Sequence, residues 1–295
     1  CTYCAIPIIR GGLRSVPLDI ILKEVEDFVK KDFFEINLVS QDLASWGTDI
    51  GLDLKDLLKG ICAIKGDFRI RLLYMHPDKF DSSILALFKE DKRLVPYFDI
   101  PFQSGSDNVI HAMNRTGSAE KYIQLVKDIR TALPDAAIRT TFLTGFPGET
   151  EEDALKTQEF LEKIQSDWSG CFEYSREEDT KAYSLKGRVA KKTAALRAQR
   201  LNELQHSITE KRLHERCKKT YDVLVEEIIQ NTEGTDEGLA IGRAWFEAPE
   251  VDGNVVIRYD LDDKKAVEAI KEGSVVKVKA VASSELDIDG VFCGN

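Results

Sequence analysis

The feature that most constrains the fold is an alternation of helical and strand patterns between residues 17 and 174. Apolar residues recur at helical spacing over 17–31, 52–64, 82–89, 108–113, 119–133 and 151–165. Short runs typical of buried strands lie between them, at 34–40, 69–74, 95–101, 137–144 and 168–174. Such alternation is typical of parallel strands with helices outside. A sixth strand would have to precede Cys1, so we expect an α/β fold built as an open (β/α)6 partial TIM barrel.

The pattern changes in the last third of the chain. Residues 191–214 are polar and helical, and we expect them to be a connector. Five short Val- and Ile-rich runs follow, at 221–229, 239–245, 255–259, 275–281 and 288–292, separated by turn residues. This spacing is typical of a small all-β barrel of the oligomer-binding type. We therefore expect three parts: a core over 1–190, a helical connector over 191–218 and a β-barrel over 219–295.

The negative charge is concentrated in the predicted β-barrel. The chain has a net charge of −10, and residues 219–295 hold 8 Lys and Arg against 17 Asp and Glu, a net −9. A strongly acidic chain is poorly suited to contact nucleic-acid phosphates. We therefore expect the acidic region to be a separate module with its own partner.

Composition indicates a cytoplasmic protein that does not enter a membrane. No uncharged stretch reaches the ~18 residues that a membrane span needs, and residues 1–30 lack a signal-peptide pattern. Four of the six cysteines are scattered singly, unlike a secreted disulfide framework. Because residue 1 is not Met, we expect the native start to lie upstream.

The first four residues, Cys1-Thr2-Tyr3-Cys4, carry the strongest chemical signal. Two cysteines at this spacing can ligate a metal or cluster, form a redox pair, or do neither. A zinc site would need two more ligands at paired spacing. The other cysteines, Cys62, Cys171, Cys217 and Cys293, lie singly in predicted helices or strands, and we expect them to be small buried apolar residues.

Cys1, Tyr3 and Cys4 resemble the second half of the CxxxCxxC loop of the radical S-adenosylmethionine (SAM) superfamily. The first cysteine of that loop would lie four positions before Cys1, outside this sequence. The resemblance implies that three cysteines hold a 4Fe–4S cluster, which leaves one iron open to chelate SAM. It assigns Cys1 and Cys4 as two of the three ligands.

Further segments resemble the methylthiotransferase branch of that superfamily, each near the carboxyl end of a predicted strand, where barrel sites form. They are residues 38–42, 74–77, 101–106, 113–117, 139–141, 145–150 and 172–177, with Thr180 and Ala182. The resemblance implies SAM contacts from Tyr3, Gln41, Asp42, Gln103, Ser104, Arg115, Arg139 and Thr141; it leaves the catalytic residues unknown. Structural roles remain open for several: Arg115 could bind helix-end carbonyls, Thr150 could cap a helix, and His76 could be structural.

Two methylthiotransferase types end in a small TRAM β-barrel: MiaB-like enzymes modify a tRNA adenosine, and RimO-like enzymes modify an aspartate of ribosomal protein S twelve. Residues 248–253, Ala-Pro-Glu-Val-Asp-Gly, resemble the RimO-like type. The acidic barrel agrees, because it should repel tRNA and favour a basic ribosomal protein.

The resemblance implies a methylthio group added to the aspartate β-carbon of S twelve, alone or in the small ribosomal subunit, by a monomer served by an electron-donor protein. It also implies a second 4Fe–4S cluster, held by three cysteines of an N-terminal domain outside this sequence. We therefore expect residues 1–295 alone to be inactive. A non-catalytic module whose acidic barrel docks a basic protein is the alternative from another class.

Overall fold

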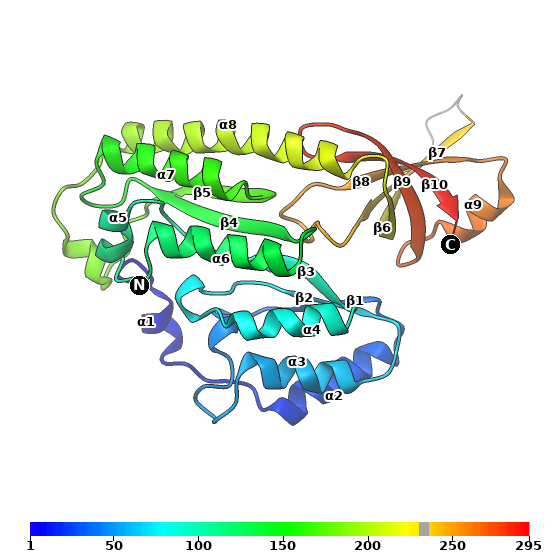
Figure 1. The fold of residues 1–295 in the computed structure, drawn as a ribbon, viewed down its shortest axis with the longest axis horizontal. Coiled ribbons are helices and arrows are strands. Elements are labelled where there is room, and N and C mark those ends of the chain that lie inside the picture. The colour runs from blue at the N-terminus through cyan, green and yellow to red at the C-terminus, as the bar shows by residue number, and fades with distance from the viewer. Residues whose placement is uncertain (230–235, 295) are drawn as a thin grey trace.

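The first part of the structure, a computed structural model that describes residues 1–229 and 236–294, is a five-stranded parallel sheet. Its strands lie side by side in chain order, as Figure 1 shows. They are β1 (Glu35–Leu38), β2 (Arg69–Leu72), β3 (Leu94–Asp99), β4 (Ala137–Thr144) and β5 (Trp168–Glu173). All five strands predicted from the alternating pattern are therefore present, and with their helices they form a partial α/β barrel.

Helices connect successive strands and lie along the outside of the sheet (Figure 1). They are α2 (Leu18–Val29), α3 (Leu54–Ala63), α4 (Leu85–Glu90), α5 (Asp107–Ala112), α6 (Ala119–Ala132) and α7 (Glu151–Ile164). Asp53 and Thr150 each begin a helix with a capping box, so Thr150 has the capping role that the sequence left open. The helix predicted over 82–89 is divided into a 3-10 turn, Ser82–Ile84, and α4.

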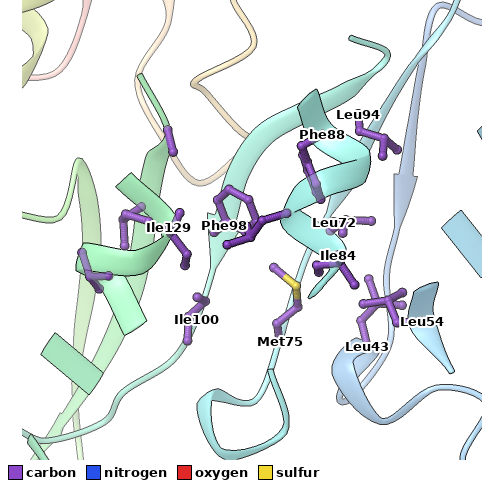
Figure 2. Close-up of a cluster of buried hydrophobic side chains, with 14 of the residues drawn as sticks. Leu43, Leu54, Leu72, Met75, Ile84, Phe88, Leu94, Phe98, Ile100 and Ile129 are labelled. Carbon is purple, nitrogen blue, oxygen red and sulfur yellow. The ribbon is translucent and has the colours of Figure 1, made fainter. Parts of the chain in front are cut away.

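The main hydrophobic core lies between the sheet and helices α3, α4 and α6, and Figure 2 shows its centre. Phe98 of β3 is fully buried, and its ring centre lies 5.0 Å from that of Phe88 on α4. Ile129 of α6 and Met75, which follows β2, are also fully buried. Each such side chain contributes roughly 1.5–3 kcal/mol on burial, so this core fixes the sheet that carries the loops.

Two short helices were not predicted, α1 (Ile6–Arg10) and α9 (Lys264–Ala269). The expectation for the single cysteines was wrong in part. Cys62, Cys171 and Cys217 are only partly buried, and Cys293 is exposed. The reason is position: Cys217 follows the last turn of a helix, and Cys293 lies near the end of the last strand.

Helix α8 (Lys191–Arg216) does more than connect the two parts of the chain. It runs along α7, β4 and β5 before it reaches the β-barrel (Figure 1). Leu201 and Ile208 join the main core. The Gln205 amide donates to the carbonyl of Ser166 at 2.9 Å, and this contact ties the helix to the segment that precedes β5.

The second part is a closed five-stranded barrel, which confirms the predicted small all-β barrel. Its strands are β6 (Thr220–Ile229), β7 (Glu237–Arg243), β8 (Val255–Asp260), β9 (Val275–Ser283) and β10 (Ile288–Gly294). They close in the order β10-β8-β7-β6-β9, and among the described pairs of this barrel only β8 with β10 is parallel. Residues 230–235 and 295 of the predicted barrel range lie outside the described residues.

The two parts meet through residues 244–253, the connection from β7 to β8, which we call the interface loop. It packs against the amino-terminal half of the sheet, which we call the closed end. The indole N–H of Trp168, the first residue of β5, donates to the carbonyl of Phe246 at 2.7 Å. Arg71 of β2 donates to the carbonyl of Trp245 at 2.8 Å. The opposite, carboxyl-terminal end of the sheet is called the open end.

Among the described residues, every helix is too short or too polar to cross a membrane.

Candidate functional site

The cysteine loop, residues 1–4, is attached to the open end of the sheet. The Thr2 backbone N–H donates to the carbonyl of Met113 at 2.9 Å, and the Thr2 hydroxyl donates to Ala112 at 2.9 Å. From the other side, the Ala182 N–H donates to the carbonyl of Thr2 at 2.9 Å. The loop is therefore held between the end of α5 and the segment that follows β5.

Both thiols of the loop are free, and neither is fully buried. The Cys1 sulfur lies 3.8 Å from Nε2 of His76, the last residue of the short connection between β2 and the 3-10 turn Pro77–Lys79. Burial lowers the pKa of His76, and the nearby Arg115 lowers it further. The loop thus presents two thiols that are not fully buried, one of them beside an imidazole.

Asp42 and Gln41 follow β1 and lie near this group. Asp42 accepts a hydrogen bond at 3.0 Å from the backbone N–H of His76, which joins it to the Cys1 environment. Gln41 is exposed. Both residues line a cavity of about 650 Å³ that extends along β1, an edge strand of the sheet.

That cavity contains polar atoms that the described residues leave unsatisfied. The side-chain oxygens of Asn37 and Ser40 are buried and have no hydrogen-bond partner among the described residues. Unpaired buried polar atoms cost roughly 1–3 kcal/mol each. The cavity wall is therefore suited to a further strand or to a polar ligand, and the predicted sixth strand would lie against this edge.

Tyr3 and Arg115 are brought together. The guanidinium of Arg115 lies 3.5 Å from the Tyr3 hydroxyl, and it donates to the carbonyl of Pro101 at 2.7 Å. Tyr3 packs edge-on against Phe146, with ring centres 6.3 Å apart. Arg115 thus binds carbonyls, the structural role left open by the sequence. Its Nε has no partner among the described residues, and that donor remains available to a ligand.

Gln103 and Thr141 are also adjacent, at the point where β3 and β4 approach the open end. The Gln103 N–H donates to the carbonyl of Thr141 at 2.8 Å, and Gln103 adopts a left-handed backbone with φ of 71°. Both residues are partly exposed. Their predicted role as SAM contacts stays a prediction.

Ser104 points away from this group. It is 3% exposed, its hydroxyl lies 3.1 Å from that of Thr157 on α7, and it accepts from the Ser106 N–H at 3.1 Å. These contacts attach the strand end to α7. They favour a structural role for Ser104 over the predicted SAM contact.

The guanidinium of Arg139 is engaged by two carboxylates. Arg139 lies in the first half of β4, and its guanidinium pairs with Asp252 of the interface loop at 3.2 Å and with Asp99 at 3.6 Å. Asp252 also accepts from the Tyr97 hydroxyl. The placement of Arg139 therefore favours a role in joining the two parts of the chain.

The closed end buries several charges that the sequence analysis missed. Burial raises the pKa of Glu247 to about 8 and that of Asp252 to about 6. Burial would also raise the pKa of Glu35, but Arg71, Arg69 and Arg243 outweigh it and hold the pKa at about 2. Glu247 and Asp252 thus belong to the interface and not to the acidic surface of the β-barrel.

A second cavity, of about 590 Å³, opens beside the cysteine loop. It lies between the ends of β4 and β5 and the start of α8, and its lining includes Gly145, Tyr174, Ala182 and Arg188. Tyr174 stacks edge-on against Phe146 at 5.5 Å, and its hydroxyl has no partner among the described residues. The open end is therefore hollowed between segments 145–150 and 172–177, and none of the eight predicted SAM contacts lines this cavity.

The residues present fit part of a cluster site. Cys1 and Cys4 supply two thiols of the kind that iron–sulfur clusters bind. In the described residues no group of three His, Cys, Asp or Glu side chains is placed to hold a metal ion. A cluster at this loop would therefore need a further ligand beyond those that the described residues place there.

Sequence reasoning left two groups without an assigned role, His76 beside the cysteine loop and Asp252 in the interface loop. His76 was left open as a structural residue, although a histidine shortly after a strand end was an available signal. Asp252 lies in the quoted segment 248–253, but its partner Arg139 is 113 positions away in the sequence. No local pattern could have indicated that pairing.

Comparison with known proteins gives consistent results. Residues 1–161 match the family described as the Radical SAM superfamily, and residues 219–292 match the TRAM domain. The chain is 50% identical over 312 aligned residues to the ribosomal protein uS12 methylthiotransferase RimO of Treponema denticola, with 99% of the chain covered. It is 38% identical over 293 residues to the protein of the same name from Thermodesulfovibrio yellowstonii, also with 99% covered.

The chain spans 66% of the length of each of these two relatives. Among solved structures, coproporphyrinogen III oxidase (HemN) of Escherichia coli, described as a radical SAM enzyme, is similar with a TM-score of 0.48 and 13% identity. That alignment covers 77% of this chain and 58% of the other. With the matched ranges and the geometry of the cysteine loop together, the chain belongs to the radical SAM superfamily and carries a C-terminal TRAM domain.

Proposed function

We propose that this chain is the catalytic core and TRAM domain of a methylthiotransferase that modifies an aspartate of ribosomal protein uS12. The observation that carries the proposal is the cysteine loop, which holds two free thiols at the open end of the sheet. The 50% identity to a uS12 methylthiotransferase supports the proposal of this reaction and this substrate.

Cys1 and Cys4 would hold a 4Fe–4S cluster together with a third cysteine upstream of Cys1. When bound, the cluster supplies the electron that cleaves SAM into methionine and a 5′-deoxyadenosyl radical. SAM would lie at the open end, within reach of Tyr3, Gln41, Asp42, Gln103, Arg115 and Thr141. Arg139 and Ser104 are not included, because their side chains are committed to other contacts.

The chain's own residues orient and enclose this site. Thr2 fixes the loop by three backbone and side-chain hydrogen bonds, and Arg115 fixes the segment after β3. The interface loop covers the closed end with buried side chains of Phe246 and Ala248, which keeps water from entering the sheet interior from that side.

We further propose the division into a core over 1–190, a connector over 191–218 and a TRAM domain over 219–295. A second cluster, held outside this chain, would deliver the methylthio group, and an electron-donor protein would reduce the first cluster. The acidic TRAM surface would favour the basic protein substrate by charge. We expect a cytoplasmic monomer.

The test uses a longer chain that carries the native sequence upstream of Cys1, reconstituted anaerobically with iron and sulfide. It is incubated with SAM and reductant and with either uS12 or tRNA, and both are analysed by mass spectrometry. Methylthiolated uS12 is the expected product. Methylthiolated tRNA would overturn the substrate, and intact SAM with both substrates would favour a non-catalytic docking module.

A further inference from the structure

We propose that His76 is a positioning residue for the cluster: its Nε2–H donates a hydrogen bond to the Cys1 thiolate and raises the reduction potential of the cluster held there. This inference rests on the proposed function, because it requires a cluster at Cys1 and Cys4. It assigns a role to His76, which is not a ligand, and it concerns the reduction potential of the cluster.

The first observation is the distance between Nε2 of His76 and the Cys1 sulfur. Nε2 of His76 lies 3.8 Å from the Cys1 sulfur, the separation of a hydrogen bond to a large sulfur atom. The two residues are 75 positions apart, so the fold and not the local chain brings them together. His76 is partly buried, which limits competition from water for the same N–H.

The second observation is the tautomer. The backbone N–H of Asp78 donates to Nδ1 of His76 at 3.2 Å. A backbone N–H can only donate, so Nδ1 must carry a lone pair, and the ring proton must lie on Nε2. The nitrogen that faces Cys1 is therefore the donor. Partners of this kind on the far ring nitrogen orient histidines beside metals.

The third observation is that the ring is held from several elements. Asp78 accepts from the Tyr122 hydroxyl at 2.6 Å and from the Thr116 N–H at 2.8 Å. The His76 backbone donates to Asp42 at 3.0 Å. A Cβ at Gly117 would lie 2.3 Å from Tyr122 and 2.5 Å from Asp78, so only glycine fits this packing. The imidazole is thus oriented before any cluster binds.

The consequence concerns electron transfer. Reduction adds negative charge to the cluster and its thiolates, and a hydrogen bond from N–H stabilises that charge. The hydrogen bond stabilises the reduced cluster more than the oxidised cluster, so the reduction potential of the cluster rises. Loss of the donor should make the cluster harder to reduce.

The experiment measures the midpoint potential by electron paramagnetic resonance during redox titration of the longer, reconstituted protein. His76→Phe removes the N–H, His76→Gln offers a replacement donor, and His111→Phe changes an exposed histidine of α5. We expect a more negative potential for His76→Phe, partial recovery for His76→Gln and no change for His111→Phe. An unchanged potential in His76→Phe with full iron content would overturn the inference.

A second readout is taken on the wild type, so its main result does not depend on how the variants fold. Spin-echo spectra of the reduced wild type should contain weak coupling to one imidazole nitrogen, and this coupling should be lost in His76→Gln. Absence of the coupling in the wild type would contradict the hydrogen bond. If the wild type itself bound no cluster, the proposed function would fail instead, and the two failures are therefore distinguishable.

Discussion

The two ends of the parallel sheet differ in how their polar side chains are paired. At the closed end, Glu35 is 3% exposed and is paired with Arg69, Arg71 and Arg243. At the open end, the thiols of Cys1 and Cys4 are free and partly accessible, and the Tyr174 hydroxyl has no partner among the described residues. The Glu35 network is fully paired, whereas one carboxylate oxygen of Glu247 has no partner in the described part of the chain and its pKa is raised by burial.

This difference predicts which substitutions should lower the stability of the fold and which should change the chemistry of the site. Removing one partner from a buried ion network leaves an uncompensated charge, which is costly. Removing a free thiol leaves packing unchanged. The predictions below exploit this contrast in order of expected effect.

The largest effect is expected for Cys4→Ser. The substitution should abolish cluster binding and activity in the longer protein, because a hydroxyl is a poor replacement for a thiolate ligand. Iron analysis and the visible absorbance of the reconstituted protein measure the loss. Cys293→Ser, at an exposed cysteine of β10, is the matched control and should bind iron as the wild type does. Equal iron content in Cys4→Ser would contradict the assignment.

Glu35→Gln should be the most damaging of the substitutions that act through stability. It removes the charge that faces Arg69, Arg71 and Arg243, so we expect a loss of ~3–5 kcal/mol in the free energy of unfolding, measured with urea. Glu237→Gln breaks an exposed pair with Arg258 and should cost less than ~1 kcal/mol. Similar values for the two variants would show that the closed end is not held by this network.

The closed end should also make stability depend on pH. The pKa of Glu247 is raised to about 8 in the folded state from 4.5, so folded protein holds a proton that the unfolded chain has lost. Stability should therefore decline between pH 4.5 and 8, at up to ~1.4 kcal/mol per pH unit. Asp252, with its pKa raised to about 6, contributes with the same sign at lower pH.

Urea unfolding at a series of pH values measures this dependence. Glu247→Gln should flatten the decline and leave the variant more stable than the wild type near pH 8. Glu35 acts in the opposite direction: its pKa is held at about 2, so its contribution is lost only as the pH falls below 4.5. An identical pH profile in Glu247→Gln and wild type would be the contrary result.

The smallest effect is expected at the open end itself. Thr150→Ala removes the capping box of α7, in which the hydroxyl accepts from the Asp153 N–H at 3.1 Å. Loss of such a cap costs ~1 kcal/mol in the free energy of unfolding. The potential and iron content of the cluster should stay at wild-type values, since Thr150 contacts neither cysteine. A loss above ~3 kcal/mol would mean that α7 has a larger role than capping explains.

The sequence predicted the repeated elements and the closed barrel well, because both depend on local periodicity and turn spacing. It also placed the cysteine loop and the polar strand ends in one region, since carboxyl ends of parallel strands share an edge. It did not predict the burial of Glu247 and Asp252. Arg139 and Tyr97, the partners of Asp252, lie 113 and 155 positions away in the sequence, and only packing brings them together. Glu247 accepts from the nearby Ala244 N–H, but its burial depends on how the interface loop packs against the sheet.

Two site residues illustrate the same limit. Ser104 follows a strand end, as a SAM contact would, yet its hydroxyl turns toward Thr157 on α7. Arg139 lies on a barrel strand, yet its charge is matched by Asp252 of the interface loop and by Asp99, the last residue of β3. Spacing in the sequence identifies the strand that carries a side chain, but it does not identify the contacts of that side chain.

The central claim is that the open end is the site where a cluster at Cys1 and Cys4 binds SAM. The most direct measurement is the electron paramagnetic resonance spectrum of the reduced, reconstituted longer protein before and after SAM is added. The account predicts that SAM changes the spectrum and that 5′-deoxyadenosine accumulates, with neither result in Cys4→Ser. A cluster spectrum that SAM leaves unchanged, with SAM recovered intact, would contradict it.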